Sequence, residues 1–141
     1  MRWRPQVTFS TPLVWSLHAA YWFIPVSFTL FTLHYLGINI SSSTALHGLT
    51  AGAISSIILA MIARIALGHS GRALIPHTAM KYAFAFIILA GISRVCAQHL
   101  QIYSTFNVYI LAAGTWILAY TIYLICYWRV LTSPRPDGRP G

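Results

Sequence analysis

Six histidines and nine basic residues are the main candidates for chemistry in this chain of 141 residues, whose only acidic residue is Asp137. Neutral imidazole is a common metal ligand, and a guanidinium group forms paired hydrogen bonds with a carboxylate or a phosphate. The sequence contains no constellation of residues typical of a catalytic site. These residue types therefore predict the binding of a metal, a cofactor or an anion.

The composition predicts that these groups lie in a membrane protein. Apolar residues make up 57% of the chain and charged residues 7%, whereas soluble domains carry roughly one quarter charged residues. Nearly every stretch of about 20 residues is apolar enough for a core, so the solvent must be lipid. The basic residues lie between apolar runs and form no basic face, which argues against nucleic-acid binding. The polar start, MRWRPQ, is not that of a cleavable signal, so we expect the first span to remain in the mature protein.

Four apolar runs have the length of a membrane-spanning helix: roughly residues 12–37, 43–67, 79–100 and 107–131. The intervening sequences GINISSST and GHSGRALIPH contain turn residues and helix caps, and PRPDGRPG cannot continue a helix. The sequence therefore predicts an all-α fold, a polytopic membrane protein with four transmembrane helices in an antiparallel bundle. We expect a single domain over residues 1–132 and a disordered cytoplasmic tail over residues 133–141.

The basic residues predict the orientation of the bundle. With four spans, one side receives eight of them: Arg2, Arg4, Arg64, Arg72, Lys81, Arg129, Arg135 and Arg139. Only Arg94 belongs to the other side. Because basic residues favour the cytoplasmic side, we expect both termini in the cytoplasm and loops 37–43 and 100–107 on the outer face.

The same topology sorts the histidines by depth. The inner half holds His18, His69 and His77, and the outer half holds His34, His47 and His99. At about 1.5 Å per residue, His18 and His47 differ by roughly 20 Å along the membrane normal, so one metal cannot bind both. The metal-ligand candidates are His47 in the outer half, with His34 and His99 nearest to it, and His18 with His69 in the inner half. We expect His34, His77 and His99, which lie near loops, to be solvated.

Arg64 and Arg94 have no carboxylate partner within the predicted bundle, although ionisable groups at membrane depth are usually paired. Arg64 lies in the last turn before Gly68, where its side chain can extend to the interface and stabilise the C-terminal end of the helix dipole. Alternatively, the partner comes from outside the chain: a lipid phosphate, a porphyrin propionate, another anionic ligand or a second subunit. The position of Arg94, against the positive-inside rule, favours this second interpretation.

His47 is followed by Gly48, Gly52 and Ser56, small residues at intervals of four that let a helix or a flat macrocycle approach the backbone closely. Helix packing is the ordinary explanation of such a pattern. The buried imidazole of His47 needs a use for its nitrogen lone pair, which favours a metal ligand, and the ordinary alternative is a hydrogen bond from the ring to a backbone carbonyl. His18 shares a helix face with Trp15 and Trp22, which is typical either of a porphyrin site or of an interfacial aromatic belt.

The segment GHSGR ends the second apolar run. Gly68 suits a left-handed helix end, and Gly71 allows a tight turn that exposes His69 and Arg72. The turn either simply ends a helix or, with Arg64, holds a propionate or another small anion.

Two further patterns indicate packing. On the fourth run, an aromatic stripe at helical spacing predicts an interhelical contact: Trp116, Tyr120, Tyr123 and Tyr127. Cys96 and Cys126 lie near opposite ends of two helices, so we expect two free thiols in small packing sites.

Four segments of the sequence resemble a known family. The segments PLVWSLHAAYWF, LHGLTAGAISSIILAMIARIALGHSGRAL, GISRV and YWRVLTSPRPDGRPG are similar to the C-terminal part of the NnrS family, over almost the whole chain. Members of that family are bacterial inner-membrane proteins that carry haem and copper and are associated with denitrification and nitric oxide stress. They are typically about three times longer, with about twelve spans. The resemblance carries the family pattern onto seven residues: His18, His47, Arg64, His69, Gly71, Arg72 and Arg94.

The resemblance implies a haem- and copper-binding membrane protein of the nitric oxide response, and it leaves open whether the chain acts as an enzyme. It also implies a partner for the missing helices, either a separate chain or further copies of this one. Three other functions remain open. A cytochrome b561-like electron carrier needs facing histidines at equal depth, and a non-catalytic assembly subunit needs no site of its own. A small multidrug-type transporter fits four spans, but proton coupling normally needs an intramembrane acid.

Overall fold

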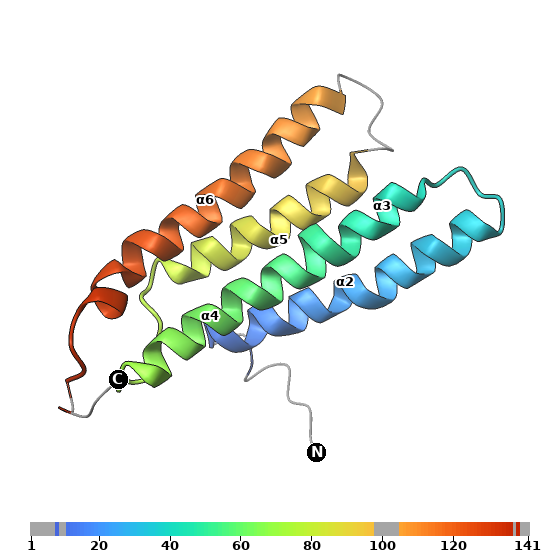
Figure 1. Ribbon diagram of the computed structural model, residues 1–141. Coiled ribbons are helices and arrows are strands. Elements are labelled where there is room, and N and C mark those ends of the chain that lie inside the picture. Colours follow the sequence, from blue (N-terminus) through green and yellow to red (C-terminus); the bar gives the residue numbers. More distant parts are fainter. Residues whose placement is uncertain (1–7, 9–10, 98–104, 137, 139–141) are drawn as a thin grey trace, which may run out of the picture.

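A computed structural model describes residues 8, 11–97, 105–136 and 138. In chain order its helices are α2 (Pro12–Tyr35), α3 (Ser42–His47), the π-helix η1 (Gly48–Ile54), α4 (Ser55–His69), α5 (Met80–Cys96) and α6 (Thr105–Thr132). Because α3, η1 and α4 follow one another without a break, they form one rod from Ser42 to His69. The four rods pack as an antiparallel bundle (Figure 1). No strand occurs within the described ranges, so the predicted all-α class is confirmed there.

Three of the rods are long and apolar enough to cross a membrane. They are Pro12–Tyr35, Ser42–His69 and Asn107–Thr132, each within two residues of the predicted boundaries. The described part of α5 has 17 residues, which corresponds to about 25 Å of helix against a hydrocarbon core of about 30 Å. The prediction of four spans is therefore confirmed for three of them, and the predicted run 79–100 extends into residues 98–104, outside the described chain.

Two glycines with a left-handed backbone end the first two rods. Gly37 follows α2 with φ of 81°, and Gly71 follows α4 with φ of 68°. After each glycine the next amide donates back to a carbonyl of the last turn, from Ile38 to Leu33 and from Arg72 to Leu67. This pattern is the Schellman motif, in which a residue without a Cβ adopts the left-handed conformation most easily.

The predicted helix end at Gly68 is wrong by a short distance. Gly68 lies inside α4, which continues to His69. The left-handed position falls at Gly71, because the amide of Gly71 donates to the Gly68 carbonyl and closes the turn there. The predicted tight turn at Gly71 is confirmed.

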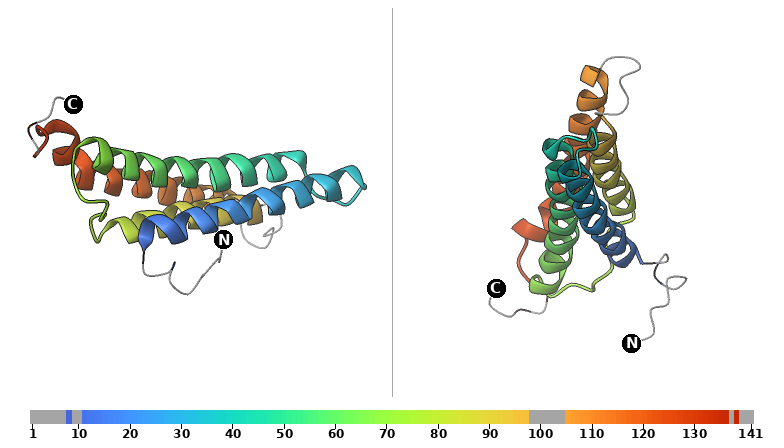
Figure 2. Two further views of the ribbon diagram at one scale, coloured as in Figure 1. Left: turned by 90° about the horizontal axis from the view of Figure 1, so that it is seen from below. Right: turned by 90° about the vertical axis from the view of Figure 1, so that its right-hand side faces the viewer.

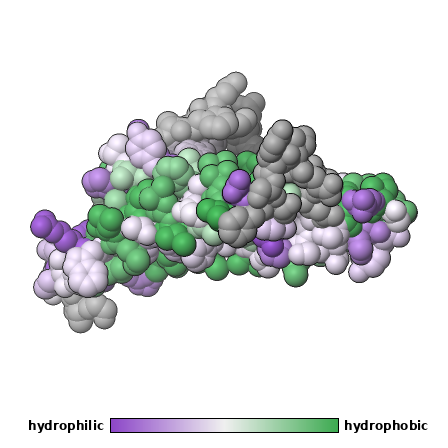
Figure 3. Space-filling view, turned by 90° about the horizontal axis from the view of Figure 1, so that it is seen from above, coloured by the Kyte–Doolittle hydropathy of each residue, from purple (hydrophilic) through white to green (hydrophobic). Residues whose placement is uncertain are grey.

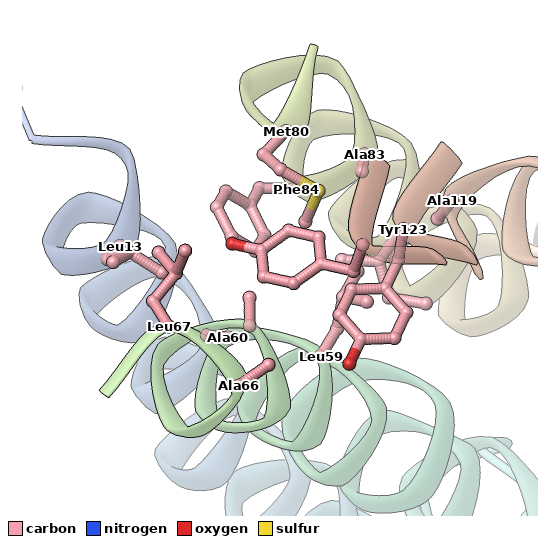
Figure 4. Close-up of a cluster of buried hydrophobic side chains, with 13 residues drawn as sticks. Leu13, Leu59, Ala60, Ala66, Leu67, Met80, Ala83, Phe84, Ala119 and Tyr123 are labelled. Carbon is pink, nitrogen blue, oxygen red and sulfur yellow. The ribbon is translucent and has the colours of Figure 1, made fainter. Parts of the chain in front are cut away.

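The main apolar core lies at the end of the bundle where α2 begins and α6 ends (Figures 1 and 2). Its most enclosed large side chains are Leu59, Met80, Phe84, Ile87 and Tyr127. Figure 4 shows these elements converging, with Leu13 of α2 near Leu67 of α4, and Tyr123 of α6 near Leu59 of α4. Within α6, Tyr123 and Tyr127 stack with their ring centroids 4.8 Å apart. Tyr120 of the same stripe donates to the Ser55 carbonyl of α4 at 3.3 Å, which confirms that the aromatic stripe of α6 makes an interhelical contact.

The other half of the bundle packs through small residues. A side chain on Gly52 would collide with the ring of Phe23, and a Cβ on Gly91 would lie 2.7 Å from the Cα of Gly52. At Gly48, a Cβ would collide with Ser27 Oγ. These close approaches confirm that the glycine pattern of the second rod is a packing face, as small residues in membrane bundles generally are.

Large apolar side chains also cover the outside of the bundle. Trp22, Ile125 and Trp128 are each at least 66% exposed, and Figure 3 shows broad apolar areas on one face. Such a surface is typical of a protein whose solvent is lipid. The described basic residues are unevenly distributed along the bundle. Arg94 lies in the last turn of α5, at one end, whereas Arg64, Arg72, Lys81 and Arg129 belong to segments at the other end.

Candidate functional site

The most specific polar contact between rods joins His47 to Arg94. His47 is the last residue of α3, and its Nδ1 donates to the Ser43 carbonyl at 2.6 Å. Arg94 of α5 donates from Nη2 to His47 Nε2 at 2.9 Å. Because a guanidinium cannot accept a hydrogen bond, Nε2 must carry the lone pair and Nδ1 the proton. The neutral tautomer of His47 is thus fixed from both sides.

Arg94 keeps its positive charge in this arrangement. Its guanidinium lies over the ring of Tyr109 at 4.4 Å from the centroid, and its neighbour His47 is neutral. No described residue is acidic, because the only acid, Asp137, lies outside the described chain. A ring face and a neutral imidazole stabilise a cation only in part. The site therefore has an uncompensated charge and favours an anion.

A groove of about 290 Å³ opens beside this cation, between the second rod and α6 with α5 as its floor. Alanines line most of it, together with Arg94 and two aromatic residues: Ala51, Ala90, Ala112, Ala113, Tyr109 and Trp116. We call it the Arg94 groove. Beyond its far end, Trp116 Nε1 donates to Ser55 Oγ at 3.3 Å, so a hydrogen bond joins α4 to α6 there.

The π-helix connects the two ends of this groove. In a π-turn each amide donates five residues back, and the backbone N–H of Ser55 donates to the Thr50 carbonyl in this way. Ser55 also donates its hydroxyl to the same carbonyl at 3.0 Å, and its own carbonyl accepts from Tyr120 OH at 3.3 Å. Side chains thus support the backbone where the winding is irregular. π-segments are frequent at functional sites, and this one directly follows His47.

His18 lies in α2, half buried, and its Nδ1 donates to the Val14 carbonyl at 2.8 Å. The contacts of Phe23 with Gly52 and of Ser27 with Gly48 set the register of this hairpin. In that register His18 lies near position 57, ten residues or about 15 Å along the axis from His47. The structure therefore separates His18 from His47, in agreement with the depth argument from the sequence.

A second groove, of about 370 Å³, lies at the end of α4 and is lined by Arg64 and His69 with apolar neighbours: Met61, Ile65, Gly68 and Leu74. Both polar side chains are exposed. Arg72 does not line this groove, because it donates from Nη1 to the Val130 carbonyl at 3.2 Å near the end of α6. The structure therefore brings Arg64 together with His69 but directs Arg72 to a helix end. His18 does not line this groove either.

The remaining histidines make local contacts. His34 Nδ1 donates to the Ile40 carbonyl at 2.7 Å, and His77 Nδ1 accepts from the Ala79 amide at 3.2 Å. Cys126 Sγ lies 3.6 Å from His77 Nδ1, a contact that no spacing in the sequence indicates. His99 lies outside the described residues.

Within the described ranges, no three His, Cys, Asp or Glu side chains gather as a metal site. Both cysteines are free thiols, as predicted. The described residues therefore offer single imidazoles, four of them with hydrogen bonds of their own, and two arginines that line grooves.

The fold and these residues define a class of protein: an all-helical bundle with three helices able to cross a membrane and an imidazole–guanidinium pair at one end. The family can be named as well. The model of the NnrS protein family matches residues 1–135, and the chain belongs to that family. No curated protein and no solved structure matches the chain.

Proposed function

We propose that this chain is a haem- and copper-binding protein of the bacterial inner membrane that acts in the response to nitric oxide stress or in denitrification. Membership of the NnrS family supports the proposal. In this proposal α5 crosses the membrane as the fourth span, because its 17 described residues need only a few more to reach bilayer length. Both termini are cytoplasmic, because the basic residues gather at the end of the bundle where α2 begins and α6 ends.

The observation that carries the proposal is the fixed tautomer of His47. Metal-binding histidines usually donate their other ring N–H to a carbonyl or carboxylate, which orients the ring and presents the remaining lone pair. The Ser43 carbonyl does this for His47 at 2.6 Å. Arg94 now occupies Nε2, so haem ligation requires that Arg94 turn away. The carboxylate of a haem propionate is a better hydrogen-bond partner for the guanidinium than a neutral imidazole is.

The other candidates have supporting roles in this proposal. His18, with its Nδ1 proton held by the Val14 carbonyl, is the second imidazole candidate as a ligand. Arg64 and His69 line one groove and can hold an anionic edge of the cofactor. Arg72 lies outside that groove and stabilises the end of α6 through the Val130 carbonyl. Bound haem would supply an iron centre for nitric oxide. Copper enters on family resemblance alone, with His47, His18 and His69 as its candidate ligands.

Optical absorption of the protein purified in detergent from haem-replete cells tests the proposal. We expect a Soret band in the wild type, loss of that band in His47→Ala, and an unchanged band in His77→Ala. His77 is the matched control, because it is also an imidazole but lies near a loop at the other end of the bundle. The same change at His18 shows whether the inner half contributes, and elemental analysis gives the copper content per chain.

Two outcomes would contradict the proposal in different ways. A Soret band that survives His47→Ala removes this residue as a ligand. A colourless preparation favours the assembly-subunit role, in which the chain supplies helices to a larger membrane complex and binds no cofactor itself.

A further inference from the structure

Arg94 retains unused hydrogen-bonding capacity. A guanidinium has five N–H donors, and only Nη2 is engaged, with His47. Within the described chain, Nε and Nη1 have no hydrogen-bond partner, and the ring of Tyr109 covers one face of the group. One edge of the guanidinium can therefore accept a bidentate anion while the contact with His47 persists.

The position of Arg94 along the bundle suits a phosphate of the bilayer surface. Arg94 lies in the last turn of the described α5, and Tyr109 lies in the first turns of α6. Tyrosine and arginine at the ends of membrane helices mark the headgroup level. At this level the anions that are always present are the phosphates of lipids.

The Arg94 groove continues from this cation towards the membrane centre. From Tyr109 to Trp116 the groove follows seven residues of α6, a length of about 10 Å. One leaflet contributes about 15 Å to a hydrocarbon core of about 30 Å, so the groove spans about two thirds of it. Its alanine lining makes it a narrow apolar groove of about 290 Å³. This is at the lower end of small-molecule pockets, which span roughly 300–1,000 Å³. The groove suits one acyl chain better than a macrocycle.

We propose that the Arg94 groove binds an anionic phospholipid of the surrounding bilayer. The free edge of Arg94 donates to the lipid phosphate, and one acyl chain lies along Ala90 and Ala113 towards Trp116. Charge complementarity selects the headgroup, because no carboxylate of the described chain neutralises Arg94. A zwitterionic lipid brings its own ammonium group and competes less well for the guanidinium. The lipid site belongs to the haem-free chain, in which Arg94 keeps its contact with His47.

Native mass spectrometry of the protein released from nanodiscs tests the site. The nanodiscs contain equal parts of phosphatidylglycerol and phosphatidylcholine, and the protein is prepared without haem. We expect retained phosphatidylglycerol on the wild type and about tenfold less on Arg94→Gln, the loss expected for a charge-assisted pair. Arg129→Gln is the matched control, because it removes the same charge from an exposed position at the other end of the bundle, outside both grooves, and should leave retention unchanged.

A second variant tests the groove without touching the charge. Ala113→Trp fills the groove and should lower retention, whereas Leu111→Trp adds the same ring to an exposed position of α6 outside the lining. Equal retention of the two lipids, or equal loss in Arg94→Gln and Arg129→Gln, would overturn the proposal. Displacement of the lipid by millimolar inorganic phosphate would instead make this a site for a free anion. Because the protein is haem-free, none of these outcomes depends on whether a Soret band forms in the other experiment.

Discussion

Replacing Gly91 by alanine should push α5 away from the π-helix. The new Cβ would lie 2.7 Å from the Cα of Gly52 and 2.9 Å from Phe23 Cζ, whereas carbon atoms pack best at about 3.5–4.0 Å. The first of these contacts is with backbone, so no side-chain rotation can relieve it and the helices must separate by about 1 Å. Arg94 lies three residues beyond Gly91, so the displacement also lengthens its hydrogen bond to His47.

Such overpacking costs about 1–3 kcal/mol. Against it stands the gain in helix propensity from glycine to alanine, which is about 1 kcal/mol in water. Gly114→Ala in α6 isolates that gain, because a Cβ at Gly114 meets nothing within 4 Å. The difference between the two variants is therefore the packing cost, about 5- to 150-fold in the ratio of folded to unfolded protein.

The measurement is unfolding by SDS in mixed detergent micelles, followed by tryptophan fluorescence. A second background separates the two collisions. Phe23→Leu should rescue Gly52→Ala, whose collisions are all with the Phe23 ring, but should rescue Gly91→Ala only in part, because its collision with the Gly52 backbone remains. If Gly91→Ala is as stable as Gly114→Ala, the close approach of the two helices described above is wrong.

Three further predictions use the same unfolding assay. Tyr120→Phe should lower the free energy of unfolding by about 0.5–1.5 kcal/mol, because the Ser55 carbonyl loses a donor. Tyr127→Phe should be neutral or stabilising, because its hydroxyl is buried without a partner in the described structure; a loss larger than that of Tyr120→Phe would refute the assignment. A double-mutant cycle with His47→Ala and Arg94→Gln should give a coupling of about 1.5–3 kcal/mol, the range for hydrogen bonds to charged groups, and additive effects would show that the pair does not form.

The arrangement of helices followed from hydropathy because each apolar run is bounded by turn residues. Span boundaries agree to within two residues for three rods. The end of α4 was misplaced at Gly68 because either of two glycines, three residues apart, suits a left-handed position. Only the hydrogen bonds of the turn select Gly71.

The contact between His47 and Arg94 was not predicted, although the sequence placed both residues in the outer half and left both without a carboxylate. They are 47 residues apart, and depth alone does not tell which way each helix is rotated. The π-helix that determines this rotation leaves no trace in the hydrophobic pattern, because small and apolar residues fit either winding. The contact of Cys126 with His77 could not be found from spacing either, because the two residues are 49 positions apart in the sequence.

The π-helix also sets the angular phase between the two halves of its rod. Seven residues from Gly48 to Ile54 complete fewer turns than they would as an α-helix, a lag on the order of 100°, the step of one residue. If the same seven residues wound as an α-helix, the imidazole of His47 would swing by about 100° to another side of the rod while α4 stayed in place. The direction in which this chain presents the imidazole of His47 thus depends on the winding of a segment that contains no polar ring at all.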